Sequence, residues 1–171
     1  MDKGYIQIYT GEGKGKTTAA IGLAVRAIGS GKKVAIIQFM KKGEHYGEFV
    51  FMTKHATMLQ FGREGFVDID SPPEEDIDLA NVGIKEAGKM IFSGMYDIII
   101  LDEIVTAVEF GLLSEGQILD LMKNKPEEIE LVLTGRGATK KMIEEADLVT
   151  EMKEIKHYYK KNVQAREGIE F

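Results

Sequence analysis

The sequence contains no cysteine and no tryptophan, and only three of its 171 residues are proline. Without cysteine, the chain has no disulfides, thiolate nucleophiles or thiolate metal sites. A chain of this kind suits a reducing compartment. The N-terminal residues Met1-Asp2-Lys3-Gly4 lead directly into a strand-like segment and show no feature of a signal peptide. We therefore expect a cytoplasmic protein.

Long hydrophobic runs and an excess of positive charge are also missing. No apolar stretch approaches the ~20 residues that a membrane-spanning helix needs, so we expect no membrane partner. The formal net charge is −6, which gives no electrostatic reason to expect a nucleic-acid partner. The lysine pairs Lys32-Lys33, Lys41-Lys42 and Lys140-Lys141 are interpreted as solvated surface.

The residues that are present are typical of a folded chain, with 44% hydrophobic and 29% charged residues. A length of 171 residues suits one domain with its own core. No repeat, low-complexity segment or linker interrupts the sequence. We therefore expect a single domain that spans residues 1–171.

Short strand-like and helix-like segments alternate along the chain. Strands are expected at residues 5–10, 33–39, 57–61, 96–102, 130–134 and 148–152. Helices are expected at residues 16–29, 49–55, 76–92, 105–111, 114–124 and 138–146, with a long loop at 62–76. This alternation predicts an α/β fold whose mostly parallel sheet has helices on both faces.

A glycine-rich segment follows the first expected strand. It reads Thr10-Gly11-Glu12-Gly13-Lys14-Gly15-Lys16-Thr17-Thr18 and matches the phosphate-binding P-loop pattern G-x-x-x-x-G-K-[ST], except that threonine stands at the first glycine. Glycines allow backbone N–H groups to approach phosphate oxygens closely, and the helix that begins at Lys16 adds its partial positive charge. Lys16 adds a full charge, and Thr17 is placed to ligate Mg²⁺. We therefore predict a P-loop NTPase-like (RecA-like) fold that binds a nucleoside triphosphate with Mg²⁺ at residues 10–18.

Two carboxylates, Asp102 and Glu103, follow the apolar residues 98–101. In P-loop proteins the acid after this strand lies near Mg²⁺. The competing interpretation is that one of the two caps the next helix. The pattern thus predicts a metal ligand but does not separate the two residues.

Arg136 follows the expected strand 130–134 and should reach the same edge of the sheet. Guanidinium matches phosphate geometry, so Arg136 is a candidate phosphate contact. A solvent-exposed arginine in a turn fits the pattern equally well.

Several segments taken together resemble one protein family. The segments are residues 9–20, Gln38-Phe39, Leu101-Asp102-Glu103, Leu133-Thr134-Gly135-Arg136-Gly137, Lys156-His157 and Gly168-Ile169-Glu170-Phe171. On these the chain resembles the P-loop ATP:corrinoid adenosyltransferases, also called cob(I)yrinic acid a,c-diamide or cob(I)alamin adenosyltransferases. That family's loop also carries threonine before its first glycine. The likeness runs through nearly the whole chain.

The resemblance implies an enzyme that transfers the 5′-deoxyadenosyl group of ATP to Co(I) of a corrinoid and releases tripolyphosphate, in adenosylcobalamin biosynthesis or salvage. It implies that the ATP phosphates lie in the loop in the reverse of the usual P-loop direction. Lys16, Thr17 and Glu103 would serve catalysis, with residues 10–18 and Arg136 holding ATP. It also implies a homodimer and a reductase, a flavodoxin or reduced flavin system, that supplies Co(I). No protein nucleophile is needed, because reduced cobalt is itself the nucleophile.

The family's corrinoid loop can carry Phe-x-Trp, whose aromatic rings displace the axial cobalt ligand. The matching segment here reads Gly65-Phe66-Val67-Asp68, so Phe66 is retained and the tryptophan is absent. Phe66 is expected to pack on the corrin face, and a loop phenylalanine folded onto the core is the competing interpretation. His157 is assigned no role as a cobalt ligand.

Other functions share the same loop. A P-loop ATPase or phosphotransferase of RecA-like fold, or a nucleotide-binding module without transfer chemistry, is compatible with it, because a fold does not fix a function. A motor ATPase would usually bring partner-binding loops or a second domain, and neither is visible in this short acidic chain.

Overall fold

The computed structural model of the protein describes residues 2–43, 45–65, 67–69 and 71–171. At its centre is a six-stranded sheet with the strand order β3-β2-β4-β5-β1-β6. Each neighbouring pair of strands is parallel. The strands are β1 Ile6–Thr10, β2 Val34–Phe39, β3 Thr57–Phe61, β4 Ile98–Asp102, β5 Glu130–Thr134 and β6 Leu148–Glu151. The predicted α/β architecture of P-loop NTPase type is confirmed.

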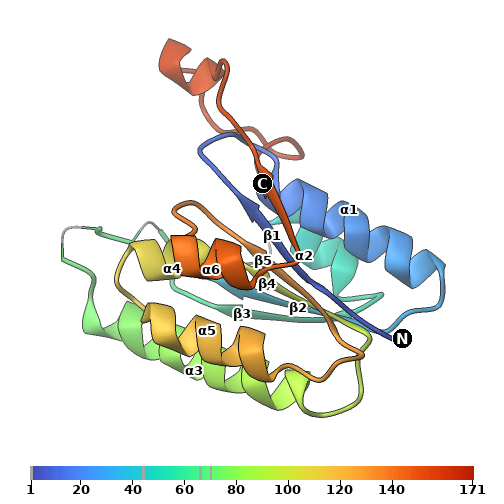
Figure 1. The fold of residues 1–171 in the computed structure, drawn as a ribbon. Coiled ribbons are helices and arrows are strands. Elements are labelled where there is room, and N and C mark those ends of the chain that lie inside the picture. The colour runs from blue at the N-terminus through green and yellow to red at the C-terminus, as the bar shows by residue number, and fades with distance from the viewer. Residues whose placement is uncertain (1, 44, 66, 70) are drawn as a thin grey trace.

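Helices cover both faces of the sheet (Figure 1). On one face lie α1 Lys16–Gly29 and α2 Gly47–Met52, and on the other α3 Glu74–Ile91, α4 Ile104–Glu109, α5 Glu115–Asn124 and α6 Lys140–Glu145. A short 3-10 helix, η1 Tyr158–Lys161, lies in the C-terminal segment. Within the described ranges, none of the helices has the length and apolar character needed to cross a bilayer.

The central strands are buried on both sides, which explains their continuous apolar runs. In β4, Ile98 and Ile100 belong to the core beneath α1, whereas Ile99 and Leu101 belong to the core beneath α3 and α5. This division follows because successive side chains of a strand point to opposite faces. The α1 side is closed by the small residues Ala20, Ala24 and Ala27, which let the helix approach the sheet closely.

The element boundaries agree with the sequence-based expectations to within about three residues, and the largest difference is at the end of α2. The helix expected at 138–146 is shorter at its start, because the Thr139 hydroxyl accepts the backbone N–H of Met142 and caps α6 there. The 3-10 helix η1 was not predicted.

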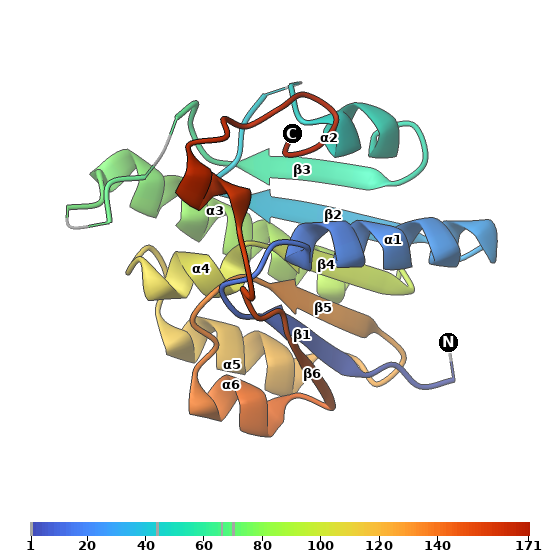
Figure 2. The same ribbon diagram turned by 90° about the horizontal axis from the view of Figure 1, so that it is seen from above.

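Parallel strands bring the site together, because their carboxyl ends share one edge of the sheet. The register places Gln38 of β2 beside Asp102 of β4 and Tyr9 of β1 beside Thr134 of β5. The phosphate loop after β1 lies at this edge. After β6, the C-terminal segment crosses over the loop toward α2 (Figure 2).

Candidate functional site

The phosphate loop connects β1 to α1, as predicted. Gly11 and Gly15 have φ angles of 96° and 120°, a conformation natural to glycine. Lys16 is buried, and its Nζ donates hydrogen bonds to the carbonyl oxygens of Gly11 at 2.7 Å and Gly13 at 2.8 Å. Burial lowers the pKa of Lys16, and the nearby Glu103 carboxylate opposes this shift. The ammonium group therefore lies inside the curve of the loop, where phosphate oxygens can replace the two carbonyls.

Two glycines of the loop are also required by packing. A Cβ at Gly11 or at Gly13 would lie 2.6 Å from the carbonyl oxygen of Met152. The N–H of Gly13 donates to that same oxygen at 2.6 Å. The chain that leaves β6 therefore lies directly against the phosphate loop and leaves no space for side chains at these positions.

Asp102 is the buried hydrogen-bonding centre of the site. Its Oδ1 accepts from the hydroxyls of Thr17 at 2.8 Å and Thr134 at 2.7 Å. Its Oδ2 accepts from Gln38 Nε2 at 3.0 Å and Lys41 Nζ at 2.9 Å. Burial by itself raises the pKa of Asp102, but the Lys41 charge and these hydrogen bonds outweigh it and hold the pKa below its ordinary value. Asp102 is therefore a buried anion that fixes the Thr17 side chain by accepting its hydroxyl proton.

Glu103 is arranged differently from its neighbour. Its φ of 63° turns the chain from β4 into α4. Its N–H donates to Thr134 Oγ1 at 2.9 Å, and its Oε2 accepts from Thr106 Oγ1 at 2.6 Å. Its Oε1 accepts no hydrogen bond from the residues that the structure describes. Glu103 thus keeps a carboxylate oxygen available, whereas Asp102 uses the roughly four acceptor positions of a carboxylate.

These residues fit Mg²⁺ only if a ligand completes its coordination. In the described part of the chain, no group of three or more histidine, aspartate or glutamate side chains could hold a metal by itself. Thr17 donates its hydroxyl proton to Asp102 and keeps oxygen lone pairs. One hydroxyl and one carboxylate oxygen, from Thr17 and Glu103, match the sparse protein ligation of Mg²⁺ when phosphate and water provide the remaining ligands.

Lys41 lies at the centre of the site, and the interpretation of Lys41 as solvated surface is wrong. Its Nζ is 3.7 Å from Glu48 Oε1 and 5.4 Å from the centroid of the Tyr46 ring, in addition to its contact with Asp102. Burial opposes the charge of Lys41, but the Asp102 carboxylate raises the pKa of Lys41 above its ordinary value. The signal that could have identified it is position, because Lys41 follows a buried parallel strand as the other site residues do.

A first cavity, of about 540 Å³, opens between the phosphate loop, the start of α2 and the C-terminal segment. This volume is within the range of small-molecule sites. Its lining residues are Lys14, Gly15, Lys16, Thr17, Thr18, Ile21, Lys41, Tyr46, Gly47, Glu48, Glu103, Gly168, Ile169, Glu170 and Phe171.

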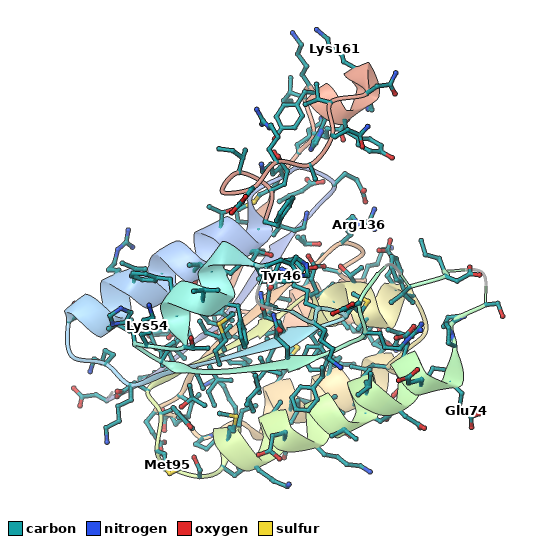
Figure 3. All side chains as sticks on the ribbon, turned by 180° about the vertical axis from the view of Figure 1, so that it is seen from behind. Tyr46, Lys54, Glu74, Met95, Arg136 and Lys161 are labelled. Atoms are coloured by element: carbon teal, nitrogen blue, oxygen red, sulfur yellow. The ribbon has the colours of Figure 1, made fainter. Side chains whose placement is uncertain are left out.

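A second cavity, of about 420 Å³, opens beside the first. Its lining residues are Lys16, Phe39, Met40, Lys41, Tyr46, Gly65, Val67, Ile69, Glu103, Thr106, Phe110 and Arg136. Its own wall is mostly apolar, and it shares Lys16, Lys41, Tyr46 and Glu103 with the first cavity. In Figure 3 the labelled Tyr46 and Arg136 lie toward the C-terminal segment, far from Met95.

Arg136 lines the second cavity and not the first. Its guanidinium is 3.6 Å from the Glu12 carboxylate and 5.7 Å from the centroid of the Phe110 ring. Arg136 is therefore a partly exposed wall residue of the second cavity, and the exposed Glu12 beside it lines neither cavity. Both interpretations of Arg136, phosphate contact and exposed turn residue, stay predictions.

Three further residues predicted for the site are Thr10, Thr18 and Phe66. Thr10 is buried, and its hydroxyl accepts the N–H of Ala138 at 3.3 Å, so its side chain supports the loop from the core side. Thr18 lines the first cavity. Phe66 lies outside the described residues, although Gly65 and Val67 on either side of it line the second cavity.

Comparison with known proteins gives a consistent result. The family model described as ATP:corrinoid adenosyltransferase BtuR/CobO/CobP matches residues 2–171. The corrinoid adenosyltransferase of Escherichia coli (strain K12) is 33% identical over 170 residues, which are 99% of this chain and 87% of that protein. The corrinoid adenosyltransferase of Pseudomonas aeruginosa is 34% identical over 172 residues, 99% and 85% of the two chains. That of Sinorhizobium sp is 36% identical over 174 residues, 99% and 81% of the two chains.

Proposed function

Because the chain belongs to the ATP:corrinoid adenosyltransferase family, we propose a role in that chemistry for each part of the site. The protein is a transferase that acts on ATP and a corrinoid. In this reaction the 5′-deoxyadenosyl group of ATP passes to Co(I), and tripolyphosphate is released. Family membership does not favour the alternative of a P-loop ATPase or phosphotransferase.

The observation that carries the proposal is the pair of cavities that meet at Lys16, Lys41, Tyr46 and Glu103. The first contains the phosphate loop and suits ATP. The second has a mostly apolar wall and suits the face of a corrin ring. A transfer between two substrates requires both to be held at one point, and the four shared residues mark that point.

The bond changes define what the protein must do. A cobalt–carbon bond forms at C5′ while the C5′–O5′ bond breaks, and its electron pair leaves with the tripolyphosphate. Negative charge therefore grows on the leaving oxygen. Lys16, Lys41 and the loop N–H groups other than that of Gly13, which is hydrogen-bonded to Met152, can stabilise that charge because they are positioned before the reaction begins. Arg136, on the wall of the second cavity, would hold a substrate there, and Phe66 would pack on the corrin face.

We assign Mg²⁺ to Thr17 and Glu103, with Asp102 as the buried acceptor that orients Thr17. When bound, the ion would add positive charge beside the tripolyphosphate. This assignment separates the two acids that the sequence pattern left together, because Asp102 has no free acceptor position.

The family likeness also supports a wider setting. We propose that residues 1–171 act as one domain, in the cytoplasm and as a homodimer, in adenosylcobalamin biosynthesis or salvage. A flavodoxin or a reduced flavin system would supply Co(I). Analytical ultracentrifugation tests the dimer. A crystal complex with ATP tests the reversed direction of the phosphates, because it identifies the phosphate beside Lys16.

The proposed reaction is tested by product analysis. The protein is incubated with ATP, Mg²⁺ and chemically reduced cobalamin, and the phosphates are separated by ion exchange. Tripolyphosphate in equal amount to adenosylated corrinoid is the expected result. ADP with orthophosphate, or bound ATP that is not consumed, would contradict the proposal.

A further inference from the structure

The C-terminal segment, residues 152–171, is the part of the molecule whose position the reaction does not explain. It leaves β6 along the phosphate loop, crosses the carboxyl edge of the sheet and ends beside α2 (Figure 2). Residues 168–171 line the first cavity together with Lys16 and Thr17. The segment therefore forms a wall of the site from a distant part of the sequence.

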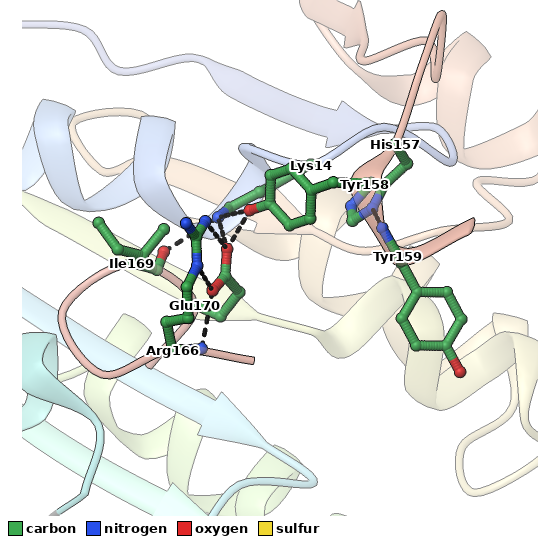
Figure 4. A network of polar contacts seen from close by, with 7 residues as sticks. All are labelled: Lys14, His157, Tyr158, Tyr159, Arg166, Ile169 and Glu170. Carbon is green, nitrogen blue, oxygen red and sulfur yellow. Dashed lines mark hydrogen bonds and ion pairs between the residues drawn. The ribbon is translucent and has the colours of Figure 1, made fainter. Parts of the chain in front are cut away.

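Polar contacts among Lys14, Tyr158, Arg166 and Glu170, here called the clasp, hold this wall to the loop (Figure 4). Lys14 Nζ donates to Glu170 Oε1 at 2.7 Å, to the Tyr158 hydroxyl at 2.9 Å and to the carbonyl oxygen of Ile169 at 3.0 Å. Three contacts use all three donors of an ammonium group. Lys14 is thus held by the C-terminal segment and does not point into the loop.

Glu170 is the other half of the clasp. Its carboxylate accepts the N–H of Arg166 at 2.8 Å, pairs with the Arg166 guanidinium and is hydrogen-bonded to Tyr158. The Glu170 side chain is only 17% exposed, although it lies near the end of the chain. Hydrogen bonds from Arg166 and Lys14 lower its pKa, so Glu170 is an anion at neutral pH. Charge-assisted hydrogen bonds of this kind are stronger than neutral ones.

The wall held by this clasp differs in chemistry from the loop that it faces. The loop presents backbone amides and Lys16, which suit phosphate. The C-terminal segment adds Ile169 and Phe171 to the lining, and Tyr46 and Ile21 are further apolar or aromatic lining residues. Ile169 is 56% exposed, although its carbonyl oxygen and the neighbouring Glu170 are held by Lys14. An aliphatic side chain left open at that place would be covered by an apolar part of a ligand.

We propose that residues 168–171 form the nucleoside-facing wall of the ATP site, and that the Lys14–Glu170 ion pair positions this wall against the phosphate loop. The proposal rests on the ATP site described above. Ile169 packs on the adenosine part of ATP, and Glu170 is a positioning residue that acts through Lys14 and the backbone of the segment.

The experiment distinguishes binding of the nucleoside from binding of the phosphates. Two probes, ATP and inorganic tripolyphosphate, are each titrated with Mg²⁺ by calorimetry. Ile169→Ser should raise the Kd for ATP about tenfold, because it removes apolar contact with the nucleoside. The Kd for tripolyphosphate should stay within about twofold, because that probe has no nucleoside. Ile155→Ser is the matched control, since Ile155 is 86% exposed in the same segment and does not line the cavity. It should change neither Kd.

Glu170→Gln provides the second arm of the test. Loss of the charge weakens the clasp, so ATP should again bind about tenfold more weakly. Tripolyphosphate should bind equally well or more tightly, because Lys14 is released from a carboxylate and can reach the polyanion. The proposal would be overturned if Ile169→Ser and Glu170→Gln lost equal affinity for ATP and for tripolyphosphate, or lost affinity for neither probe. A wild-type protein that binds neither probe would overturn the ATP site itself, and this wall with it.

Discussion

The ammonium group of Lys16 binds two carbonyl oxygens of its own loop. Replacing it by Lys16→Ala should lower kcat about 10²–10³-fold, because a charge aimed at the leaving group is lost. Tripolyphosphate release from ATP in the presence of reduced cobalamin measures this. Lys89→Ala, at an exposed lysine of α3, is the control and should be fully active. Near-normal turnover in Lys16→Ala would show that the loop is not the catalytic site.

Lys41 offers a test of the buried charges. Lys41→Met removes the cation paired with Asp102 and should lower the free energy of unfolding by about 3 kcal/mol, because a buried carboxylate loses its charge partner. Lys42→Met, at the exposed neighbouring lysine, should change it by less than about 0.5 kcal/mol. Urea unfolding in magnesium-free buffer measures both. Equal effects of the two substitutions would show that Lys41 is not part of a buried pair.

The same pair predicts a pH dependence. In the wild type the pKa of Asp102 lies below its ordinary value. Asp102 therefore contributes stability above pH of about 3.9 that is lost as pH falls through the lower folded pKa. In Lys41→Met, burial becomes the dominant effect and raises that pKa, so the variant loses stability as pH rises. The difference in unfolding free energy between wild type and variant should grow from pH 4 to pH 8, and a constant difference would contradict the assignment.

At the scale of single residues, the sequence predicts which residues carry the chemistry better than it predicts which residues contact one another. The phosphate loop and the acidic pair were identified from pattern, because glycine, lysine and carboxylate at that spacing have few other uses. The proposed choice of Glu103 over Asp102 as metal ligand rests on contacts that follow from the strand register, which places Gln38 beside Asp102. Lys41 was missed for the same reason. A lysine pair in a polar loop has no property in sequence that distinguishes a buried member from an exposed one.

At the scale of the elements, the chain after β6 restricts which side chains the phosphate loop can accept. Gly13→Ala should lower the free energy of unfolding by about 1–3 kcal/mol, because the new Cβ would lie 2.6 Å from a backbone oxygen of Met152. Gly22→Ala makes the same chemical change inside α1, where an added Cβ has no atom within 4 Å. It should raise the free energy of unfolding by about 0.5–1 kcal/mol, because glycine is unfavourable within a helix.

Thermal unfolding and ATP titration of both variants check this pair. Gly13→Ala should also weaken ATP binding, since the loop must shift to accept the methyl group. If Gly13→Ala were as stable as the wild type, the close packing of Met152, just after β6, against the loop would be wrong. If Gly22→Ala were destabilised, α1 would have a neighbour at that position.

The helices and strands were largely predictable because each carries a local signal. Continuous apolar runs mark β2, β4 and β5, since both of their faces are buried. The C-terminal segment carries no such signal. Its partners are Lys14 and the cavity wall, which are distant in sequence, so η1 and the clasp could be seen only in three dimensions.

For the molecule as a whole, the two cavities predict that the two substrates can be disturbed separately. Ile69 is 55% exposed and lines only the second cavity. Ile69→Ser should raise the KM for the corrinoid about three- to tenfold and leave the Kd for ATP unchanged. Phe66→Ala should act in the same direction, because its neighbours Gly65 and Val67 line that cavity.

Steady-state kinetics with varied corrinoid and calorimetry with ATP measure the two effects. Val82→Ser, at an exposed position of α3, is the control for loss of a surface aliphatic group. Equal weakening of corrinoid and ATP would show that the second cavity is not a separate substrate site, and that Phe66 is structural.

The contact between Lys14 and Glu170 spans 156 positions of the sequence. During synthesis the loop emerges from the ribosome long before the residues that complete its surroundings. A nascent chain therefore exposes a glycine-rich loop without Met152 against it and without the clasp over it. We expect that ribosome-bound chains halted before residue 150 retain little ATP, and that nucleotide capture begins only once residues 152–171 have emerged.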